Sequence, residues 1–199
     1  MKNGVSKKSN GLMAGMAALA VAGALETSAH SADILIAMGI AKANIQAAAR
    51  DPRVEVDPGW RIVINNVSRA FDRAKFLEAT PGFTWEQCDE KQRVLAYVFR
   101  GGTEVYICPL QSKQGNDHMA QTLIHESTHV SGNYDECKTT EVELSITTLA
   151  GKQPYRNGYV KRCGFDGRFD FRGDSADWGV DAQPSGKAPS DWGVEQKPR

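Results

Sequence analysis

Apolar residues recur at helical spacing over much of the first half of the chain. Residues 33–50 are rich in alanine, with larger apolar side chains three or four positions apart, which predicts an amphipathic helix that Asp33 could cap. Proline and glycine interrupt the chain at residues 51–59, and helical spacing then returns from Trp60 to Leu77. We therefore expect two consecutive amphipathic helices, each with one face buried in the fold.

The pattern changes after residue 83. Two short segments rich in β-branched and aromatic residues, Val94–Phe99 and Glu104–Cys108, flank the sequence Arg-Gly-Gly-Thr. Two such segments around a glycine turn predict a β-hairpin.

Helical spacing resumes after this hairpin. Asn116 or Asp117 could cap a helix that continues to about Val130, where the glycine-containing residues 131–133 would end it, and a further helix is expected from Thr139 to Leu149. The pattern predicts an α+β protein, mainly helical, with a small antiparallel β-hairpin or sheet. A chain of 199 residues suits one domain with appendages.

The predicted helix that ends near Val130 carries the motif His-Glu-x-x-His, formed by His125, Glu126 and His129. Residues i and i+4 share one face of a helix, so both imidazoles can reach one metal ion. The carboxylate of Glu126 can then reach a water molecule bound to that ion and act as its general base. This arrangement is typical of a zinc hydrolase.

A catalytic zinc ion takes three protein ligands and keeps one position open for water. The third ligand is expected from the residues beyond the turn at Gly132. Four acidic residues follow closely and all remain open on spacing alone: Asp135, Glu136, Glu141 and Glu143.

The first 32 residues are typical of an export signal. Three lysines lie among the first eight residues, Leu12–Leu25 is apolar and alanine-rich, and small residues follow, with candidate cleavage positions between Ala29 and Ala32. We therefore expect residues 1–32 to be a signal peptide and the protein to be secreted or periplasmic.

Charge and composition exclude two classes of partner. Without residues 1–32 the chain has 21 basic and 23 acidic side chains, a net charge of −2. Nucleic-acid binding would call for a basic face, and no further segment is long and apolar enough to span a membrane.

A monomer that acts on a protein or peptide substrate is expected.

Four cysteines remain in the exported chain. An even number in an oxidising compartment predicts two disulfides, and no Cys-x-x-Cys pair indicates metal binding instead. The sequence alone leaves three pairings open.

The composition becomes rich in Gly, Asp, Ser and Pro from about Phe165. Residues 166–199 contain two copies of one motif, Asp-Trp-Gly-Val-Asp at residues 177–181 and Asp-Trp-Gly-Val-Glu at residues 191–195. This composition predicts a disordered tail. A sharper interpretation is a pair of docking motifs, because a tryptophan can anchor in a partner's pocket.

The segment from Cys88 to Asp135 resembles the deuterolysin and peptidyl-Lys metalloendopeptidase family, the aspzincins. The resemblance rests on Ala-Tyr-Val at residues 96–98, on Tyr-Ile-Cys-Pro at the end of the predicted hairpin, and on Thr-Leu-Ile-His-Glu-x-x-His. Gly-Asn-Tyr-Asp at residues 132–135 stands where the family has Gly-Thr-x-Asp, and residues 156–159 faintly resemble the family's closing Asn-Ala-Asp-x-Tyr.

This resemblance implies a zincin-like metalloprotease domain over residues 33–165 and a secreted zinc-dependent endopeptidase. It implies that one Zn²⁺ ion is held by His125, His129 and Asp135, with Glu126 as the general base. It also implies the disulfide pairing, Cys88 with Cys108 and Cys137 with Cys163.

The sequence departs from the family pattern three residues after the implied aspartate ligand. The family has a tyrosine there, thought to stabilise the oxyanion, whereas this chain has Lys138 and Thr139. Either Lys138 serves as a cationic donor, or a tyrosine from elsewhere does so (Tyr134, Tyr155 or Tyr159), or activity is reduced. Loss of one oxyanion donor typically costs about 10²–10³ in rate, which weakens an enzyme without abolishing it.

Two other functions fit the same residues. One is a catalytically weak or inactive zinc-binding pseudo-protease that serves as a protein-interaction module. The other is a zinc amidohydrolase that acts on cell-wall peptide.

Overall fold

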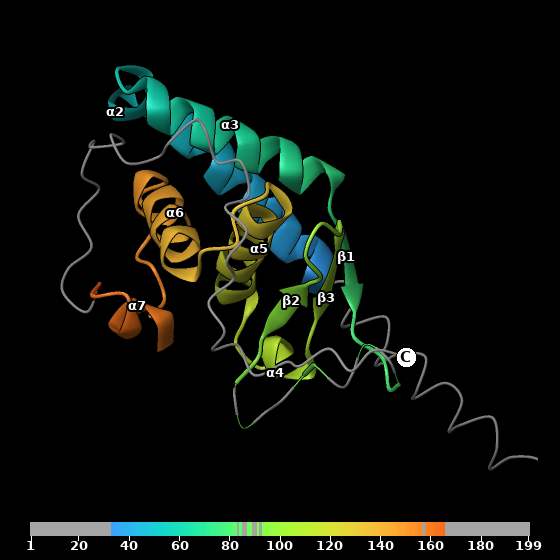
Figure 1. Ribbon diagram of the computed structural model, residues 1–199. Helices are drawn as coiled ribbons and strands as arrows, with labels where there is room; N and C mark the ends of the chain where they lie inside the picture. Colours follow the sequence, from blue (N-terminus) through green and yellow to red (C-terminus); the bar gives the residue numbers. More distant parts are fainter. Residues whose placement is uncertain are drawn as a thin grey trace, which may run out of the picture.

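The fold is mixed α+β and mostly helical, as the sequence pattern predicts, and its small sheet has three strands (Figure 1). The computed structural model describes residues 33–82, 84, 87–88, 91, 93–156 and 158–165. The predicted signal peptide and the predicted tail with its two tryptophan motifs lie outside these residues.

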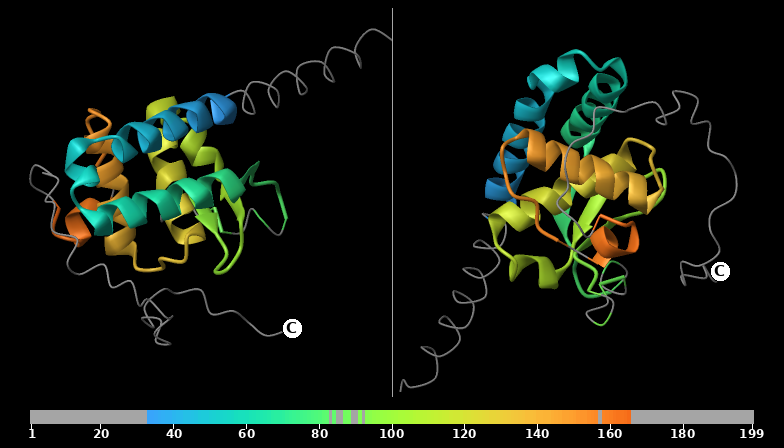
Figure 2. Two further views of the ribbon diagram at one scale, coloured as in Figure 1. Left: turned by 90° about the horizontal axis from the view of Figure 1, so that it is seen from above. Right: turned by 90° about the vertical axis from the view of Figure 1, so that its left-hand side faces the viewer.

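The first part of the fold is a pair of helices packed side by side. Residues 33–49 are helical, the short α2 (Pro52–Glu55) follows, and α3 (Pro58–Arg73) runs back alongside the first helix (Figure 2). The Asp-Pro pairs that interrupt the sequence pattern are helix starts. The carboxylates of Asp51 and Asp57 accept hydrogen bonds from backbone N–H groups of α2 and α3, and proline occupies the first turn, where its missing N–H costs nothing.

The sheet has the strand order β1-β3-β2. The strands β2 (Ala96–Val98) and β3 (Glu104–Ile107) are antiparallel, which confirms the predicted hairpin. The strand β1 (Lys75–Glu78) pairs parallel with β3 and was not predicted.

The prediction of a helix to Leu77 was wrong at this end, because α3 ends at Arg73 and β1 begins at Lys75. The backbone N–H of Lys75 donates to the carbonyl oxygen of Thr103 at 2.8 Å, and the ring of Phe76 packs against Phe71 at 5.1 Å. The strand therefore depends on a partner far along the sequence, which no local spacing reveals.

The second half of the chain is helical: α4 (Pro109–Ser112), α5 (Asn116–Val130), α6 (Glu136–Leu149) and α7 (Gly158–Arg162). The bounds of α5 agree with the prediction, but its N-cap is Gly115 rather than Asn116 or Asp117, and it has no side-chain cap. Helix α6 begins already at Glu136 because the carboxylate of Asp135 caps it. The short α7 was not predicted.

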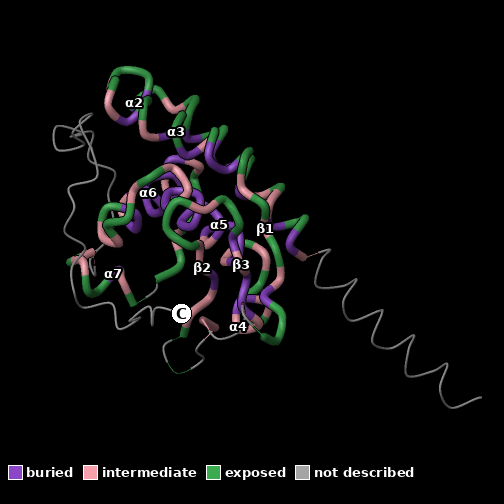
Figure 3. The backbone as a smooth tube through the Cα atoms, turned by 45° about the vertical axis from the view of Figure 1, so that its right-hand side comes forward, coloured by how far each residue is buried: buried purple, intermediate pink, exposed green. Residues whose placement is uncertain are grey.

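Helix α5 lies at the centre of the molecule, in contact with α3, α6 and β2 (Figures 1 and 3). Its apolar residues join a core formed with the helix at residues 33–49, α3 and α6. The residues of α5 in this core are Met119, Ala120, Leu123 and Ile124. The helix that carries the His-Glu-x-x-His motif is therefore held in place from several sides.

Two disulfides have the pairing that the family resemblance implied. Cys88–Cys108 ties the end of β3 to the segment before β2, and Cys137–Cys163 ties the first turn of α6 to the residue after α7. Both are compatible with an oxidising compartment. Among the described helices, none combines the length and the apolar character that crossing a membrane requires.

The core predicts a sharp contrast between two isoleucines on α3. Ile64 is completely buried in the core, whereas Ile62 is 43% exposed. We expect Ile64→Ala to lower the free energy of unfolding by about 2–5 kcal/mol, because it removes buried methylene groups and leaves a cavity. Ile62→Ala should change it by less than about 0.5 kcal/mol. Urea denaturation of both variants measures the difference, and equal losses would contradict this assignment of the core.

Candidate metal centre

One face of α5 is polar although the helix is buried. Gln121, His125 and His129 follow one another at intervals of four residues and are at most 8% exposed. A buried polar side chain costs free energy unless it finds a hydrogen-bond partner. The partners of these three residues come from α6 and from the segments on either side of it.

The two histidines of the motif meet one carboxylate, that of Glu136 at the start of α6. The Nε2 atom of His125 lies 3.1 Å from Oε2 of Glu136, and the Nε2 atom of His129 lies 3.3 Å from Oε1. One ligand atom from each residue lies within 4.8 Å of the others, so this group could hold a metal ion.

The opposite edge of each imidazole is held by a hydrogen bond. Nδ1 of His125 lies 2.7 Å from Oε2 of Glu143, and Nδ1 of His129 lies 2.8 Å from the backbone oxygen of Asn133. Since both partners are acceptors, each Nδ1 carries the proton and donates it. Such outer hydrogen bonds fix the tautomer and the ring orientation of metal-binding histidines, and they would leave Nε2 of each ring to face a bound ion.

The structure brings Glu136, and not Asp135, to the two histidines. Helix α5 ends at a turn in which Gly132 has φ = 104°, a conformation that favours glycine. After this turn Oδ1 of Asp135 accepts hydrogen bonds from the backbone N–H groups of Cys137 at 2.9 Å and Lys138 at 3.0 Å. Asp135, the ligand that the resemblance implied, is thus the N-cap of α6. Glu136, in the first turn of α6, reaches the imidazoles instead.

The remaining acidic candidates have other places. Glu143 lies behind His125 as a hydrogen-bond partner, and Glu141, on α6, is not part of the metal-binding group found among the described residues. Spacing alone had left Glu136 open as a ligand, and nothing in the sequence distinguished its role from that of Glu143.

Burial and neighbouring charge set the protonation of the group. Burial alone would lower the pKa of His125, but hydrogen bonds to Glu136 and Glu143 outweigh it and raise that pKa well above its usual value. Burial alone would raise the pKa of Glu136, but hydrogen bonds from both histidines lower it to about 2. These carboxylates therefore create a site that favours a positive charge.

Glu126, the motif's glutamate, is buried beside the histidines. Only 6% of its surface is exposed. Burial raises the pKa of its carboxyl, and the nearby imidazoles only partly offset this effect. A carboxyl whose pKa moves toward neutral is better matched to accepting and returning a proton near pH 7.

Two tyrosines flank the histidine pair. The ring of Tyr159, on α7, stacks on His125 with 6.1 Å between centroids, and the ring of Tyr134 stacks on His129 at 6.5 Å. Burial and the nearby carboxylate of Glu136 raise the pKa of Tyr159 to about 12, so its hydroxyl stays protonated and can donate.

The other three residues considered for the oxyanion role, Tyr134, Tyr155 and Lys138, have other contacts or surroundings. The hydroxyl oxygen of Tyr134 accepts a hydrogen bond from the backbone N–H of Gly101 at 2.8 Å, which ties the turn of the β-hairpin to the metal centre. Tyr155 packs against His118 with 4.9 Å between ring centroids, and Lys138 is exposed on the first turn of α6. Tyr134 and Tyr159 are thus the two candidates whose rings lie against a predicted ligand, and Tyr134 also serves the turn of the β-hairpin.

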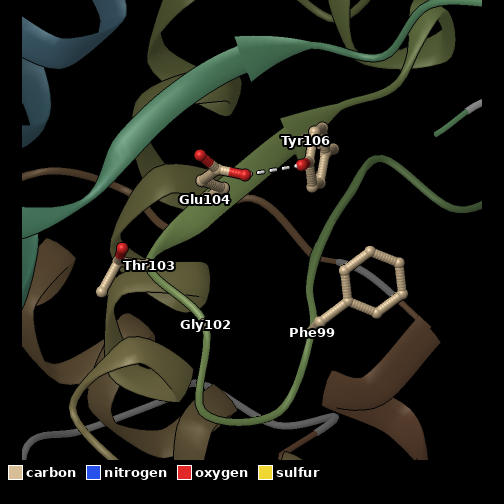
Figure 4. Close-up of a pocket in the computed structure, with 5 residues that line it drawn as sticks. All are labelled: Phe99, Gly102, Thr103, Glu104 and Tyr106. Carbon is tan, nitrogen blue, oxygen red and sulfur yellow. Dashed lines mark hydrogen bonds between the residues drawn. The ribbon is translucent and has the colours of Figure 1, made fainter.

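A surface pocket at the β-hairpin is lined by residues outside this group. It is lined by Phe99, Gly102, Thr103, Glu104 and Tyr106 (Figure 4). The Tyr106 hydroxyl donates to the Glu104 carboxylate at 2.8 Å, and no residue of the His-Glu-x-x-His motif lines the pocket. The candidate chemistry therefore belongs to the buried cluster and not to this pocket.

Comparisons of the chain with models of protein families, with curated proteins and with solved structures find no match. The resemblance to aspzincins therefore stays a prediction that rests on the motifs of this sequence.

Proposed function

We propose that the protein is a zinc-dependent endopeptidase with a zincin-like domain, exported from the cell and acting on protein or peptide substrates as a monomer. The observation that carries the proposal is the cluster of His125, His129 and Glu136 with the buried carboxyl of Glu126 beside it. Two imidazoles, one carboxylate and an adjacent glutamate are the chemical groups that a zinc peptidase requires.

The donor set fits a zinc ion on two grounds. Two imidazole nitrogens and one carboxylate oxygen form a His₂Glu set, which leaves one tetrahedral position open. In addition, the carboxylates of Glu126, Glu136 and Glu143 surround only two imidazoles, and buried negative charge is stabilised by a cation. In this proposal Glu136 is the third ligand, and Asp135 stabilises α6 as its cap.

A bound zinc ion would supply Lewis-acid chemistry, which polarises a carbonyl group and lowers the pKa of a water molecule to about 7. Glu126 is the residue placed to take a proton from the attacking water and to deliver it to the leaving amine. Its buried position beside the histidines and the direction of its pKa shift both support this role.

Tyr159 is the residue that we propose to stabilise the oxyanion, in place of the tyrosine that the family pattern has near Lys138. Its protonated hydroxyl and its position against His125 support this role. The disulfide Cys137–Cys163 holds α7, which carries Tyr159, close to the start of α6, which carries Glu136. The donor would therefore come from a different helix.

The first prediction from this proposal separates the two acidic residues that could be the third ligand. Glu136→Gln should weaken zinc binding by more than about 10- to 100-fold. Losses in that range are typical when only an outer hydrogen-bond partner of a metal ligand is changed, and here a ligand itself is changed. Asp135→Asn, the same chemical change one residue earlier, should bind zinc like the wild type, because asparagine caps helices as well as aspartate does. Titration against a chromophoric chelator measures both affinities. The opposite pattern would make Asp135 the ligand.

The second prediction concerns the general base. Glu126→Gln should still bind zinc, but it should lower kcat for peptide cleavage by about 10²–10⁴, the contribution typical of a positioned general base. Glu55→Gln, an exposed glutamate on α2, is the matched control and should cleave like the wild type. Zinc-loaded proteins are compared on a casein or peptide-library substrate, with a chelator added in a parallel series. Wild-type cleavage by the Glu126 variant would rule out this mechanism.

The third prediction identifies the oxyanion donor. Tyr159→Phe removes only the hydroxyl and should lower kcat by about 10²–10³ with little change in KM. Tyr134→Phe and Lys138→Met are the comparison variants and should each retain most of kcat. A large fall in kcat for Lys138→Met together with an unaffected Tyr159→Phe would assign the role to the lysine instead.

A further inference from the structure

Gln121 lies one helical turn before His125 on the polar face of α5 and is only 3% exposed. Its side-chain amide makes hydrogen bonds at both ends. Nε2 donates to Oε1 of Glu143 and, at 2.9 Å, to the backbone oxygen of Tyr155, while Oε1 accepts from the backbone N–H of Tyr155 at 2.8 Å. No motif in the sequence singles out this residue.

These partners permit only one orientation of the amide. The Nε2 end faces two acceptors, a carboxylate and a carbonyl oxygen, and the Oε1 end faces a donor, the N–H of Tyr155. The reversed amide would set an oxygen against two acceptors and an NH₂ group against a donor. Gln121 is therefore a fixed connection with a defined direction.

One end of this connection leads to a metal ligand. The Oε1 atom of Glu143 takes the hydrogen bond from Gln121, and the Oε2 atom takes the hydrogen bond from Nδ1 of His125. Glu143 is 1% exposed, so water does not replace a lost partner easily. If Gln121 did not hold it, the Glu143 carboxylate could turn away from His125, and the ring of His125 would lose the contact that orients it.

The other end leads to the segment that carries Tyr159. The amide of Gln121 pairs with both backbone groups of Tyr155, in the connection between α6 and α7. Tyr159 follows four residues later, and its ring stacks on the same His125. The two routes from Gln121, through Glu143 and through Tyr155, thus meet again at one imidazole.

We propose that Gln121 is a positioning residue that sets His125 as a metal ligand through Glu143 and at the same time anchors the α6–α7 connection that carries Tyr159. The inference rests on the proposed metal centre. Gln121 touches neither the metal position nor a substrate, and it acts through hydrogen bonds to groups that do. Its loss weakens metal binding and lowers kcat together.

Two substitutions and one matched control test this role. Gln121→Met keeps the length of the side chain but removes every hydrogen bond. Gln121→Glu keeps the shape and the acceptor for the N–H of Tyr155 but replaces the donor that holds Glu143. Gln111→Met is the control, because Gln111 is also buried and accepts a hydrogen bond from Thr122 at 2.8 Å, but none of the hydrogen bonds found among the described residues joins it to Glu143 or to either histidine.

The proteins are compared by zinc affinity, by the visible absorption of the Co²⁺ form and by kcat. Both Gln121 variants should bind zinc about 10- to 100-fold more weakly than the wild type, the cost typical of an outer partner. The Co²⁺ spectrum should change, since it reports the arrangement of the ligands. Gln111→Met should keep the wild-type affinity and spectrum, whatever its effect on thermal stability.

The outcomes distinguish this inference from the proposed function. If the wild type binds zinc but cleaves no peptide, the endopeptidase proposal fails, and the affinities of the Gln121 variants still decide the role of Gln121. Wild-type affinity and an unchanged Co²⁺ spectrum in the isosteric Gln121→Glu variant would overturn the inference while hydrolysis by the wild type stands. An equal loss of affinity in Gln111→Met would assign the effect to general destabilisation and overturn it as well. A wild type that binds no zinc overturns both proposals.

Discussion

The arrangement of the site depends on how the two histidines of α5 are held from behind. An imidazole offers a lone pair to a metal only at the nitrogen that carries no proton, so the partner of the other nitrogen decides which edge faces inward. Here Glu143 fixes Nδ1 of His125, and the backbone oxygen of Asn133 fixes Nδ1 of His129. Both Nε2 atoms consequently point to the same place, where Glu136 lies.

Helix α6 supplies the carboxylates that contact the histidines of α5. Its first turn carries Glu136, and Glu143 lies further along the same helix, so one rigid element places both the carboxylate in front of His125 and the one behind it. The cap at Asp135 fixes where this helix begins, and the disulfide at Cys137 joins it to the end of α7. The distances among the ligand atoms are therefore set by the packing of α5 against α6 rather than by the loop between them.

The sequence predicted those parts of the fold that repeat locally. The bounds of α5 and the antiparallel hairpin follow from periodicity over a few residues, and the structure confirms them. The parallel strand β1 has no such signal, because its partner β3 lies 29 positions further on, as in the pairing of Lys75 with Glu104. Sequence spacing also could not decide whether Asp135 or Glu136 is the third ligand, because the two residues are adjacent. They differ in which of them caps the start of α6.

The position of Tyr159 bears on the role of Lys138, which stands where the aspzincin pattern has a tyrosine. A donor to the oxyanion is defined by where its hydrogen lies and by its staying protonated, and not by its distance in sequence from the ligands. Burial keeps the hydroxyl of Tyr159 protonated, and stacking on His125 holds its ring beside the site. Lys138, by contrast, lies exposed on the first turn of α6, where water solvates its ammonium group and screens its charge. In the proposed mechanism, a lysine at that position therefore removes a donor from α6 without removing a donor from the site. This requires that the segment before α7 is held in place, as the paired hydrogen bonds between Gln121 and Tyr155 do.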